Sequence, residues 1–185
     1  MSAINVILLI ILLATTISLT IRMLYTTNLS NLNNTKDKLI DSENECFQKY
    51  KNKYDYIIKM IQIVENKYKV SSKIFEDAKE IKIDSIDSFK SEKIFNKCFK
   101  EIMHIKEDNI KIKETKAFRE LIDNYNSNEL DLISLRTYHN KYTLIYNNMI
   151  KKFPYNIISK IKKYNVDSLI EGTEIDINFN NDLEV

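Results

Sequence analysis

Residues 132–154 read LISLRTYHNKYTLIYNNMIKKFP, and this stretch decides the fold. Its large side chains recur at alternating spacings of three and four, at Leu132, Leu135, His139, Tyr142, Tyr146, Met149 and Phe153. This spacing keeps side chains on one face of a helix with 3.6 residues per turn. Pro154 lacks an N–H group and disfavours helical geometry in the residue before it. We therefore predict one long helix that buries one face and ends at the proline.

The composition extends this prediction to the whole chain. The 185 residues include one glycine and one proline, so little interrupts a helix and little supports tight hairpin turns. The net charge of +2, from 28 basic and 26 acidic residues, lacks the concentrated positive charge of nucleic-acid-binding proteins. We predict an all-α protein with one soluble domain and no nucleic-acid partner.

An apolar segment follows the N-terminal tip, residues 1–3. Between Ile4 and Ile21 the polar side chains are Asn5 and a few hydroxyl groups that can bond to their own helix, and about 20 such residues span a bilayer. No Lys or Arg precedes the run and no small-x-small cleavage site follows it, so an uncleaved anchor is favoured over a signal peptide. We expect residues 4–24 to contact the lipid bilayer as a single-pass transmembrane helix.

The distribution of positive charge favours one orientation of this helix. The chain carries no Lys or Arg before the apolar segment, whereas Arg22, Lys36 and Lys38 follow it. Positively charged flanks tend to stay in the cytosol. We therefore predict a cell-membrane protein with its N terminus outside and its helical bundle in the cytosol.

A second pattern of threes and fours predicts a long heptad helix from about Lys36 to Lys82, after a polar juxtamembrane segment at residues 25–35. Its positions are Phe47, Tyr50, Tyr54, Ile57, Ile61, Val64, Tyr68, Ser71, Phe75 and Ala78. At 1.5 Å per residue this helix would extend on the order of 70 Å. Its tyrosines can bury their rings while their hydroxyls reach the bundle edge, so core packing explains them.

Two turns are expected before the helix quoted first. The first is at residues 84–91, which lack periodicity and end in Ser91, a plausible N-cap. The second is at residues 124–128, where Asn128 followed by Asp131 resembles a capping box. The apolar stripe between the turns changes phase, which indicates two helices or one bent helix.

The C-terminal residues predict a short helix and an extended tail. Residues 156–163 follow an amphipathic helical pattern, and period-two alternation indicates an extended segment within residues 165–185, packed on the bundle or on a partner. The apolar positions of these two segments are Ile157, Ile158, Ile161, Ile175, Ile177 and Phe179. The bundle itself would occupy residues 36–164, with three to four long antiparallel helices.

One set of residues carries a family resemblance, which runs without a gap from about Glu107 to Phe153. The set is Phe118 and Leu121, Glu129, Arg136, Asn140, Tyr146 with Asn147, and Phe153 with Pro154. In this spacing the chain resembles the LemA family, a group of single-pass, membrane-anchored helical proteins. The resemblance implies an anchored bundle of antiparallel helices with a largely undefined biochemical role, and it carries over no catalytic residue.

Two positions depart from the family pattern. His139 stands where the first motif tyrosine would fall, which weakens any role assigned to that ring. Asn109 and Ile110 replace a Tyr-Pro pair that often opens the preceding helix. This replacement predicts a straighter middle block than in the relatives.

The strongest enzyme-like pattern is Glu101-x-x-His104, because a Glu and a His three apart on a helix can face a bundle core and bind iron or manganese. Such a site needs a second copy, and Arg136, three residues before His139, cannot be a ligand. The chain contains no His-Glu-x-x-His motif, no glycine-rich phosphate loop and no nucleophile elbow. We expect no catalytic, cofactor-binding or metal-binding residues, and hence no enzyme.

Arg136, Asn140 and Asn147 form a polar ridge on the predicted helix, since they are four and seven residues apart. One interpretation is a contact strip for a partner helix or peptide. The other, which we favour, is a structural network in which these side chains bond across the bundle, to Glu129 or to another helix, and fix its register.

The two cysteines, Cys46 and Cys98, lie within helical patterns and not in a Cys-x-x-Cys motif, so neither a zinc site nor a redox site is indicated. Their spacing leaves open whether they pair.

Two functions fit these predictions. The first is a membrane-anchored interaction or scaffold module that binds a protein partner or a second copy of itself. The second is a sensory or ligand-binding bundle outside the cell, with a pocket between helices lined by tyrosines. Membrane topology separates the two.

Overall fold

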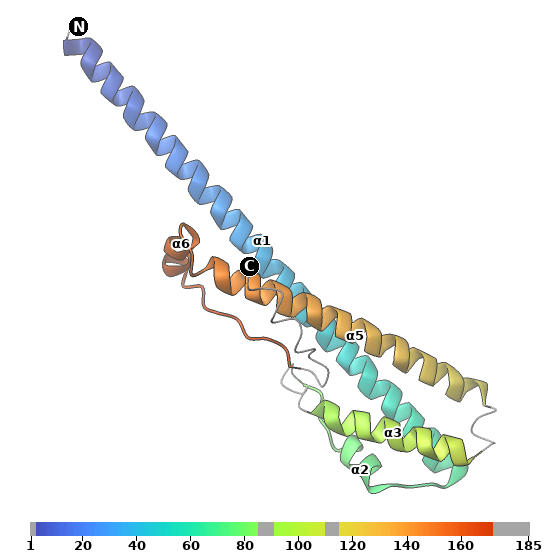
Figure 1. Cartoon of the computed structure of the whole chain (residues 1–185). Coiled ribbons are helices and arrows are strands. Elements are labelled where there is room, and N and C mark those ends of the chain that lie inside the picture. Colours follow the sequence, from blue (N-terminus) through green and yellow to red (C-terminus); the bar gives the residue numbers. More distant parts are fainter. Residues whose placement is uncertain (1–2, 85–90, 110–114, 172–185) are drawn as a thin grey trace, which may run out of the picture. The chain divides into compact units, whose positions relative to one another are not determined.

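The computed structural model describes residues 3–84, 91–109 and 115–171 (Figure 1). Every regular element in these residues is a helix, which confirms the all-α prediction. The helices are α1 (Ala3–Tyr68), α2 (Lys73–Lys79), α3 (Glu92–Asp108), α5 (Lys116–Met149) and α6 (Tyr155–Lys162). The predicted alternation within the C-terminal tail, at Ile175, Ile177 and Phe179, lies outside the described residues.

The chain divides into two compact units. Unit 1 comprises Met1–Ile40 and Lys141–Ser168, and unit 2 comprises Asp41–Asn140 and Leu169–Val185. Helices α1 and α5 contribute residues to both units, and each unit has a hydrophobic core of its own.

Helix α1 is one continuous helix of 66 residues. The expectation that a long helix begins near Lys36 is wrong, because α1 runs through all of the polar stretch before it. Within that stretch, Thr26, Asn28 and Thr35 donate to backbone carbonyls three or four residues earlier, across 3.0, 2.7 and 2.9 Å. Such polar groups can compete with the backbone for hydrogen bonds, and here they are satisfied inside the helix.

Helix α1 also ends earlier than the predicted Lys82. Its last residue is Tyr68, and Lys69 follows in the left-handed region with φ 58°. The N–H of Lys69 donates to the carbonyl of Glu65 across 3.2 Å, as in the motif that commonly ends helices. The heptad pattern continues past this point, but it continues in a separate helix, α2.

Helix α3 and helix α5 resolve the middle block into two helices, one of the two predicted alternatives. Helix α3 ends at Asp108, and Asn109 at its C-cap is extended, with φ −123° and ψ 102°. The expectation that this block is straighter than in the relatives stays a prediction, and residues 110–114 of the block lie outside the described residues. Ser91 stands at the N-cap of α3 but forms no side-chain cap hydrogen bond. Residues 85–90 of the predicted first turn lie outside the described residues.

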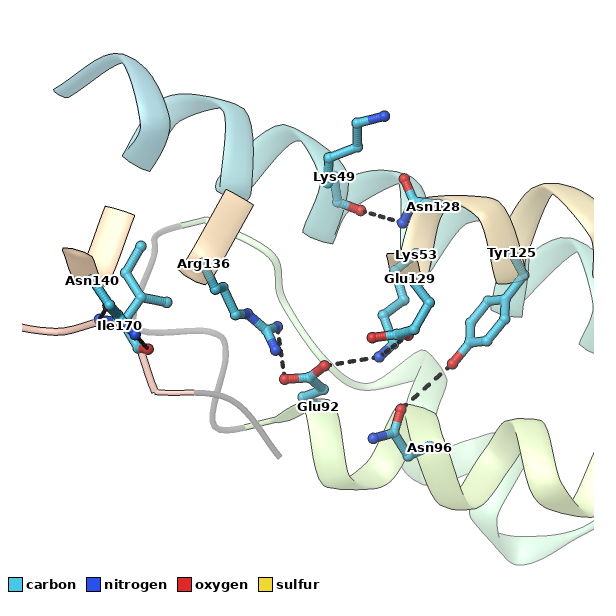
Figure 2. Close-up of polar contacts among 10 residues, drawn as sticks. All are labelled: Lys49, Lys53, Glu92, Asn96, Tyr125, Asn128, Glu129, Arg136, Asn140 and Ile170. Carbon is cyan, nitrogen blue, oxygen red and sulfur yellow. Dashed lines mark hydrogen bonds and ion pairs between the residues drawn. The ribbon is translucent and has the colours of Figure 1, made fainter. Parts of the chain in front are cut away.

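Helix α5 runs through the residues expected to form the second turn. Tyr125 and Asn128 are 4% and 5% exposed, and the Asn128 amide donates to the backbone carbonyl of Lys49 across 2.9 Å (Figure 2). The predicted turn at residues 124–128 and the capping box of Asn128 with Asp131 are therefore wrong. Packing against α1 outweighs the turn preference of asparagine.

The stretch quoted first is helical up to Met149, five residues before Pro154. Its inner face includes His139 and Tyr146, which are 2% and 1% exposed. Phe153 lies beyond the end of the helix and is 77% exposed, so the prediction that it continues the buried face is wrong.

Helix α6 confirms the short amphipathic helix predicted after the proline. Its Ile158 is buried at 3% exposed, whereas Ile157 and Ile161 are exposed. The helix ends at Lys162, and its C-cap Lys163 is in the left-handed region with φ 55°. The Tyr164 N–H donates back to the Ser159 carbonyl across 2.9 Å.

The two cores draw on different parts of α1 and α5. The unit 1 core consists of Leu32, Leu39, Tyr146, Ile150 and Ile158, with Tyr25, Leu29, Tyr142, Met149, Tyr155 and Tyr164 packed against it. The unit 2 core includes Cys46, Tyr50, Ile57, Met60, Ile61, Val64, Phe75, Ala78, Phe95, Cys98, Ile102, Phe118, Ile122, Tyr125, Leu132 and Ile170. Unit 2 is thus a helical bundle closed by α1, α2, α3 and α5.

Candidate functional site

Four charged side chains of unit 2 form a buried ion-pair network (Figure 2). Lys53 Nζ lies 2.9 Å from Glu92 Oε1 and also pairs with Glu129 Oε2. Arg136 Nη2 lies 2.8 Å from Glu92 Oε2. The Lys53 and Glu92 side chains are 0% and 1% exposed. The network therefore joins α1, α3 and α5 through Lys53, Glu92 and Arg136, which are almost fully withdrawn from water, and through Glu129, whose side chain is 23% exposed.

Glu92 is the centre of this network. Each of its two carboxylate oxygens accepts a hydrogen bond from a different cation, one from Lys53 and one from Arg136. The buried charges are balanced, with two positive and two negative groups once Glu129 is included. Removing one partner of such a group leaves a buried charge without compensation, which typically costs about 3–5 kcal/mol. The arrangement fixes how three helices pack.

The ring of Tyr125 packs beside this network. Lys53 Nζ lies 5.7 Å from the ring centroid, and the hydroxyl donates to Asn96 Oδ1 at 3.5 Å (Figure 2). Burial raises the pKa of the Tyr125 hydroxyl well above its ordinary value, and the negative charges of Glu129 and Glu92 raise it further. The ring also stacks on Phe99, with centroids 4.1 Å apart, so Tyr125 belongs to both the polar and the apolar core.

The network sits at seam positions of the helices. Along α5, one row of residues seven apart consists of Ile122, Glu129, Arg136 and Thr143, of which Glu129 is half-buried and the others are buried. Along α1, the fully buried row with the same spacing is Leu32, Leu39, Cys46, Lys53 and Met60. A repeat of seven keeps side chains on one seam of a packed helix. Lys53, Glu129 and Arg136 therefore occupy places that the surrounding pattern gives to apolar residues.

The three residues of the predicted polar ridge lie in different surroundings. Arg136 is 6% exposed and pairs with Glu92 of α3, whereas Asn140 and Asn147 are half-buried. Arg136 thus belongs to the seam and not to a ridge beside it. The assignment of the three to a partner-contact strip or to a structural network stays a prediction.

Both ridge asparagines bind the backbone of the segment after α6. In unit 2, Asn140 donates to the Ile170 carbonyl at 3.2 Å and accepts from the Ile170 N–H at 2.9 Å (Figure 2). In unit 1, Asn147 makes the same pair of bonds with Asp167, at 2.9 and 2.8 Å. An asparagine amide offers one donor and one acceptor, which match the two groups of a single residue's backbone. These contacts support the structural interpretation.

His139 is also buried, and its Nδ1 lies 3.0 Å from Ser42 Oγ. It therefore holds a seam position between α1 and α5 where the family pattern has a tyrosine. Polar contacts at buried positions have to be matched, because an unmatched group costs about 1–3 kcal/mol.

Cys46 and Cys98 are free thiols, and both are fully buried. Burial raises the pKa of each thiol from 9.0 to about 12. Both therefore stay protonated near neutral pH, in a form that is a poor nucleophile and a poor metal ligand.

The enzyme-like pair Glu101 and His104 lies on the outer surface of α3. Both residues are exposed, and His104 Nδ1 lies 3.4 Å from Asp108 Oδ2. The two side chains therefore do not face the bundle core. Across the described residues, no group of three or more His, Cys, Asp and Glu is arranged to hold a metal ion.

Sequence reasoning missed Lys53 and Glu92, the two most buried members of the network. The signal for Lys53 was present, since it interrupts a row of buried residues seven apart. Glu92 stands three residues before Phe95 and follows the phase of the α3 stripe. On each of three helices, a charged residue occupies a position that the repeat gives to apolar residues. This pattern would have predicted the network.

A model of the LemA family matches residues 43–179, well over half of the chain. The chain belongs to the LemA family. The LemA match includes α2, α3, α5 and α6, and with them the ion-pair network and both backbone-binding asparagines. The match begins within α1, after the apolar N-terminal part of that helix. No significant match to a curated protein or to a solved structure was found.

Proposed function

We propose that this LemA-family chain is a single-pass, membrane-anchored helical bundle that acts as a non-enzymatic interaction or scaffold module. The observation that carries the proposal is the unpacked apolar part of α1. In the described residues, α1 is the one helix long and apolar enough to cross a membrane, and none of its most apolar window is buried. A signal sequence has the same length and composition, so the anchor needs its own test.

Hydrogen bonding inside the apolar segment supports an anchor. The hydroxyls of Thr15, Thr16 and Thr20 donate to carbonyls three or four residues earlier in the same helix, across 2.8, 2.9 and 2.8 Å. In hydrocarbon every polar group has to be satisfied within the protein, because no water can replace a missing partner. Residues 4–24 would cover about 30 Å, the thickness of the hydrocarbon core.

Charge near the end of the segment supports a cytosolic bundle. Arg22, Lys36 and Lys38 follow the apolar segment within unit 1, and no Lys or Arg precedes it. Lys36 and Lys38 also lie 4.8 Å from the ring centroids of Tyr164 and Tyr142. Long cationic side chains in this position favour the cytosolic side of a membrane.

The aromatic side chains of unit 2 favour a scaffold over the alternative of an extracytoplasmic sensory or ligand-binding bundle. Tyr50 and Tyr54 pack on Phe95, each with ring centroids 5.6 Å apart, and Tyr125 stacks on Phe99. Tyr50 and Tyr125 are 0% and 4% exposed and belong to the core, and Tyr54 packs against it. Outward-facing Leu130 and Tyr138 of α5 are 68% and 41% exposed and offer an apolar contact for a protein partner or a second copy.

The anchor is tested by extracting membranes that carry the full chain with alkaline carbonate. We expect the wild type to stay in the membrane fraction. Leu9→Arg with Leu12→Arg should release it, because a charge near the centre of a span costs about 2.5–3.5 kcal/mol. The matched control is Leu130→Arg, which changes an equally exposed leucine of unit 2 and should stay in the membrane. Release of the wild type would overturn the anchor.

The orientation is tested with a membrane-impermeant maleimide on intact cells. Cys98 is fully buried and unsuited to labelling, so the exposed position Leu130→Cys serves as the reporter. We expect labelling only after the cells are permeabilised. Labelling of intact cells would favour the sensory alternative and contradict the cytosolic scaffold.

A further inference from the structure

Helix α6 and the turn before it present an apolar face that no described residue covers. Ile157 and Ile161 are four residues apart on α6 and are 51% and 63% exposed, and Phe153, in the turn before the helix, is 77% exposed. The opposite face of α6 is anchored in the unit 1 core through Ile158 and Ser159, which are 3% and 6% exposed. The outward face is therefore held in place, and it is apolar where a surface helix is normally polar.

A cluster of lysines surrounds this face, and it is unusual in a chain of net charge +2. The lysines are Lys151, Lys152, Lys160, Lys162 and Lys163, all exposed. Residues 150–166 contain no Asp or Glu to balance them. Apolar side chains flanked by lysines are the features of helices that lie in the plane of a membrane surface rich in anionic lipid.

Helix α6 is also held close to the end of the proposed span. In unit 1 the Tyr164 hydroxyl donates to Asn33 Oδ1 across 2.7 Å, and Tyr25 and Leu29 pack against the core that includes Ile158. Asn33 comes nine residues after Leu24, which places it about 14 Å further along the helix axis. The headgroup layer beyond the hydrocarbon is several ångströms deep, and long lysine side chains extend their reach toward it.

We propose that α6 is a second membrane contact, in which Phe153, Ile157 and Ile161 enter the interface and the surrounding lysines bind anionic lipid headgroups. This inference rests on the proposed anchor. The occupant is assigned from charge complementarity and from the contacts that hold α6 beside α1 next to the span. Together the two contacts would fix the height of unit 1 at the membrane.

The test uses the absence of tryptophan from the chain, which makes Phe153→Trp a single fluorescent reporter. The full-length variant is reconstituted into phosphatidylcholine vesicles with or without phosphatidylglycerol, and with lipids brominated near the headgroup as quenchers. With phosphatidylglycerol we expect emission at shorter wavelength and strong quenching. The control Leu130→Trp, at a similarly exposed site in unit 2, should give the same emission in both vesicles.

Removing the lysines sharpens the test. Replacing Lys151, Lys152, Lys160 and Lys162 by Gln should return the Phe153→Trp signal to that of neutral vesicles, since each lysine near an anionic surface strengthens docking about fivefold. Circular dichroism should show the same helix content for both proteins, so that the loss is not one of folding.

Three results would overturn the inference. The first is an unshifted, unquenched Phe153→Trp in chains that float with the vesicles, which leaves the anchor intact. The second is equal quenching in neutral and anionic vesicles, which removes the role of the lysines. The third is a shift that depends on protein concentration in detergent, which would assign the face to a second copy of the chain. Chains that fail to float would overturn the anchor itself, and the inference with it.

Discussion

Units 1 and 2 differ in which side chains they bury and which they expose. Unit 2 buries Lys53, Glu92 and Arg136 among its core residues, while the part of α1 in unit 1 exposes nearly every isoleucine and leucine from Ile4 to Leu24. Both arrangements would be unfavourable if the whole chain were solvated by water and its charges were unpaired. In unit 2, ion-pair partners allow charged side chains to be buried. In unit 1, the exposed isoleucines and leucines agree with the proposed membrane anchor.

In both regions, polar groups that are buried or that lie in the apolar segment have partners within the protein, at Glu92 and at the threonine hydroxyls. In unit 2 the partner of a buried cation is Glu92, whose two oxygens are both used. In the apolar segment the partners of the threonine hydroxyls are carbonyls of the same helix. The predictions below test these partners in unit 2 first, where the expected effects are largest.

The largest expected effect is that of Lys53→Ala. It leaves the buried Glu92 with one partner fewer and Glu129 without its cation, so the free energy of unfolding should fall by about 3–5 kcal/mol. Chemical denaturation of the full chain in detergent, followed by circular dichroism, measures the loss.

The matched control for Lys53 is Lys49, four residues earlier on α1. Lys49 pairs with Asp131, but the two side chains are 34% and 51% exposed. Exposed pairs contribute less than about 1 kcal/mol, so Lys49→Ala should change the stability little. Equal losses for the two variants would mean that burial does not distinguish the two pairs.

An alkaline titration should show the second effect, at Tyr125. The raised pKa means that the folded protein keeps this proton where the unfolded chain, with an ordinary pKa of 10.0, loses it. The unfolded state then binds fewer protons, so the free energy of unfolding falls as the pH rises above 10, by up to about 1.4 kcal/mol per pH unit. Tyr125→Phe keeps the stacked ring and removes one ionising group, so it should make this decline shallower, while Tyr50, whose pKa burial also raises, still contributes.

The alkaline decline of the wild type should begin nearer pH 9, because the unfolded thiols of Cys46 and Cys98 ionise from 9.0 while the folded ones do not. The loss of stability caused by the two thiols should remain in Tyr125→Phe. Identical slopes of the two proteins above pH 10 would show that the Tyr125 hydroxyl is not protected by the core.

The two backbone-binding asparagines should give smaller and local effects. Asn147→Ala should speed hydrogen exchange of the Asp167 N–H without changing that of Ile170, and Asn140→Ala should do the reverse. Each variant loses two neutral hydrogen bonds at a half-buried site, so each should cost about 1–2 kcal/mol. Exchange measured by mass spectrometry provides the readout, and each variant is the control for the other. Faster exchange at both sites in either variant would mean that the segment is released as one piece.

The smallest signal is expected from the native cysteines. Because both thiols are buried and protonated, maleimide should label neither Cys46 nor Cys98 in the folded protein and should label both in denaturant. Rapid labelling of the native protein would contradict the packing of α1 and α3 in unit 2.

The predictable parts of this fold are those in which local pattern and packing agree. The amphipathic spacing predicted helix α6, and the alternating spacing of three and four residues predicted the buried face around Tyr146. The missed boundaries have physical causes. Lys69 follows the end of α1 in a left-handed conformation, although glycine is the residue usually found in that conformation. The asparagines near Asn128 are typical of a turn, but packing between helices keeps them in α5.

The candidate site was predictable only in part. Arg136, Asn140 and Asn147 were singled out by their spacing, but the partner of Arg136 lies 44 residues away in α3 and only the tertiary fold brings them together. Asn140 and Asn147 bind backbone groups. Every residue has a backbone, so the sequence does not show which residue an asparagine will bind. Lys53 was detectable as a charge in a buried row of seven, and a heptad count along α1 would have found it.

The central claim is that the apolar part of α1 has lipid and not water around it. The most direct measurement places single cysteines, one at a time, along residues 4–40 in native membranes and labels them with a polar maleimide. The native thiols are buried and should add little background. We predict a continuous unlabelled window over residues 4–24 on every face of the helix, followed by labelling at outward positions such as Ile40, which is 46% exposed. Labelling through residues 4–24 in the folded protein would show that water surrounds this segment, and it would contradict the account.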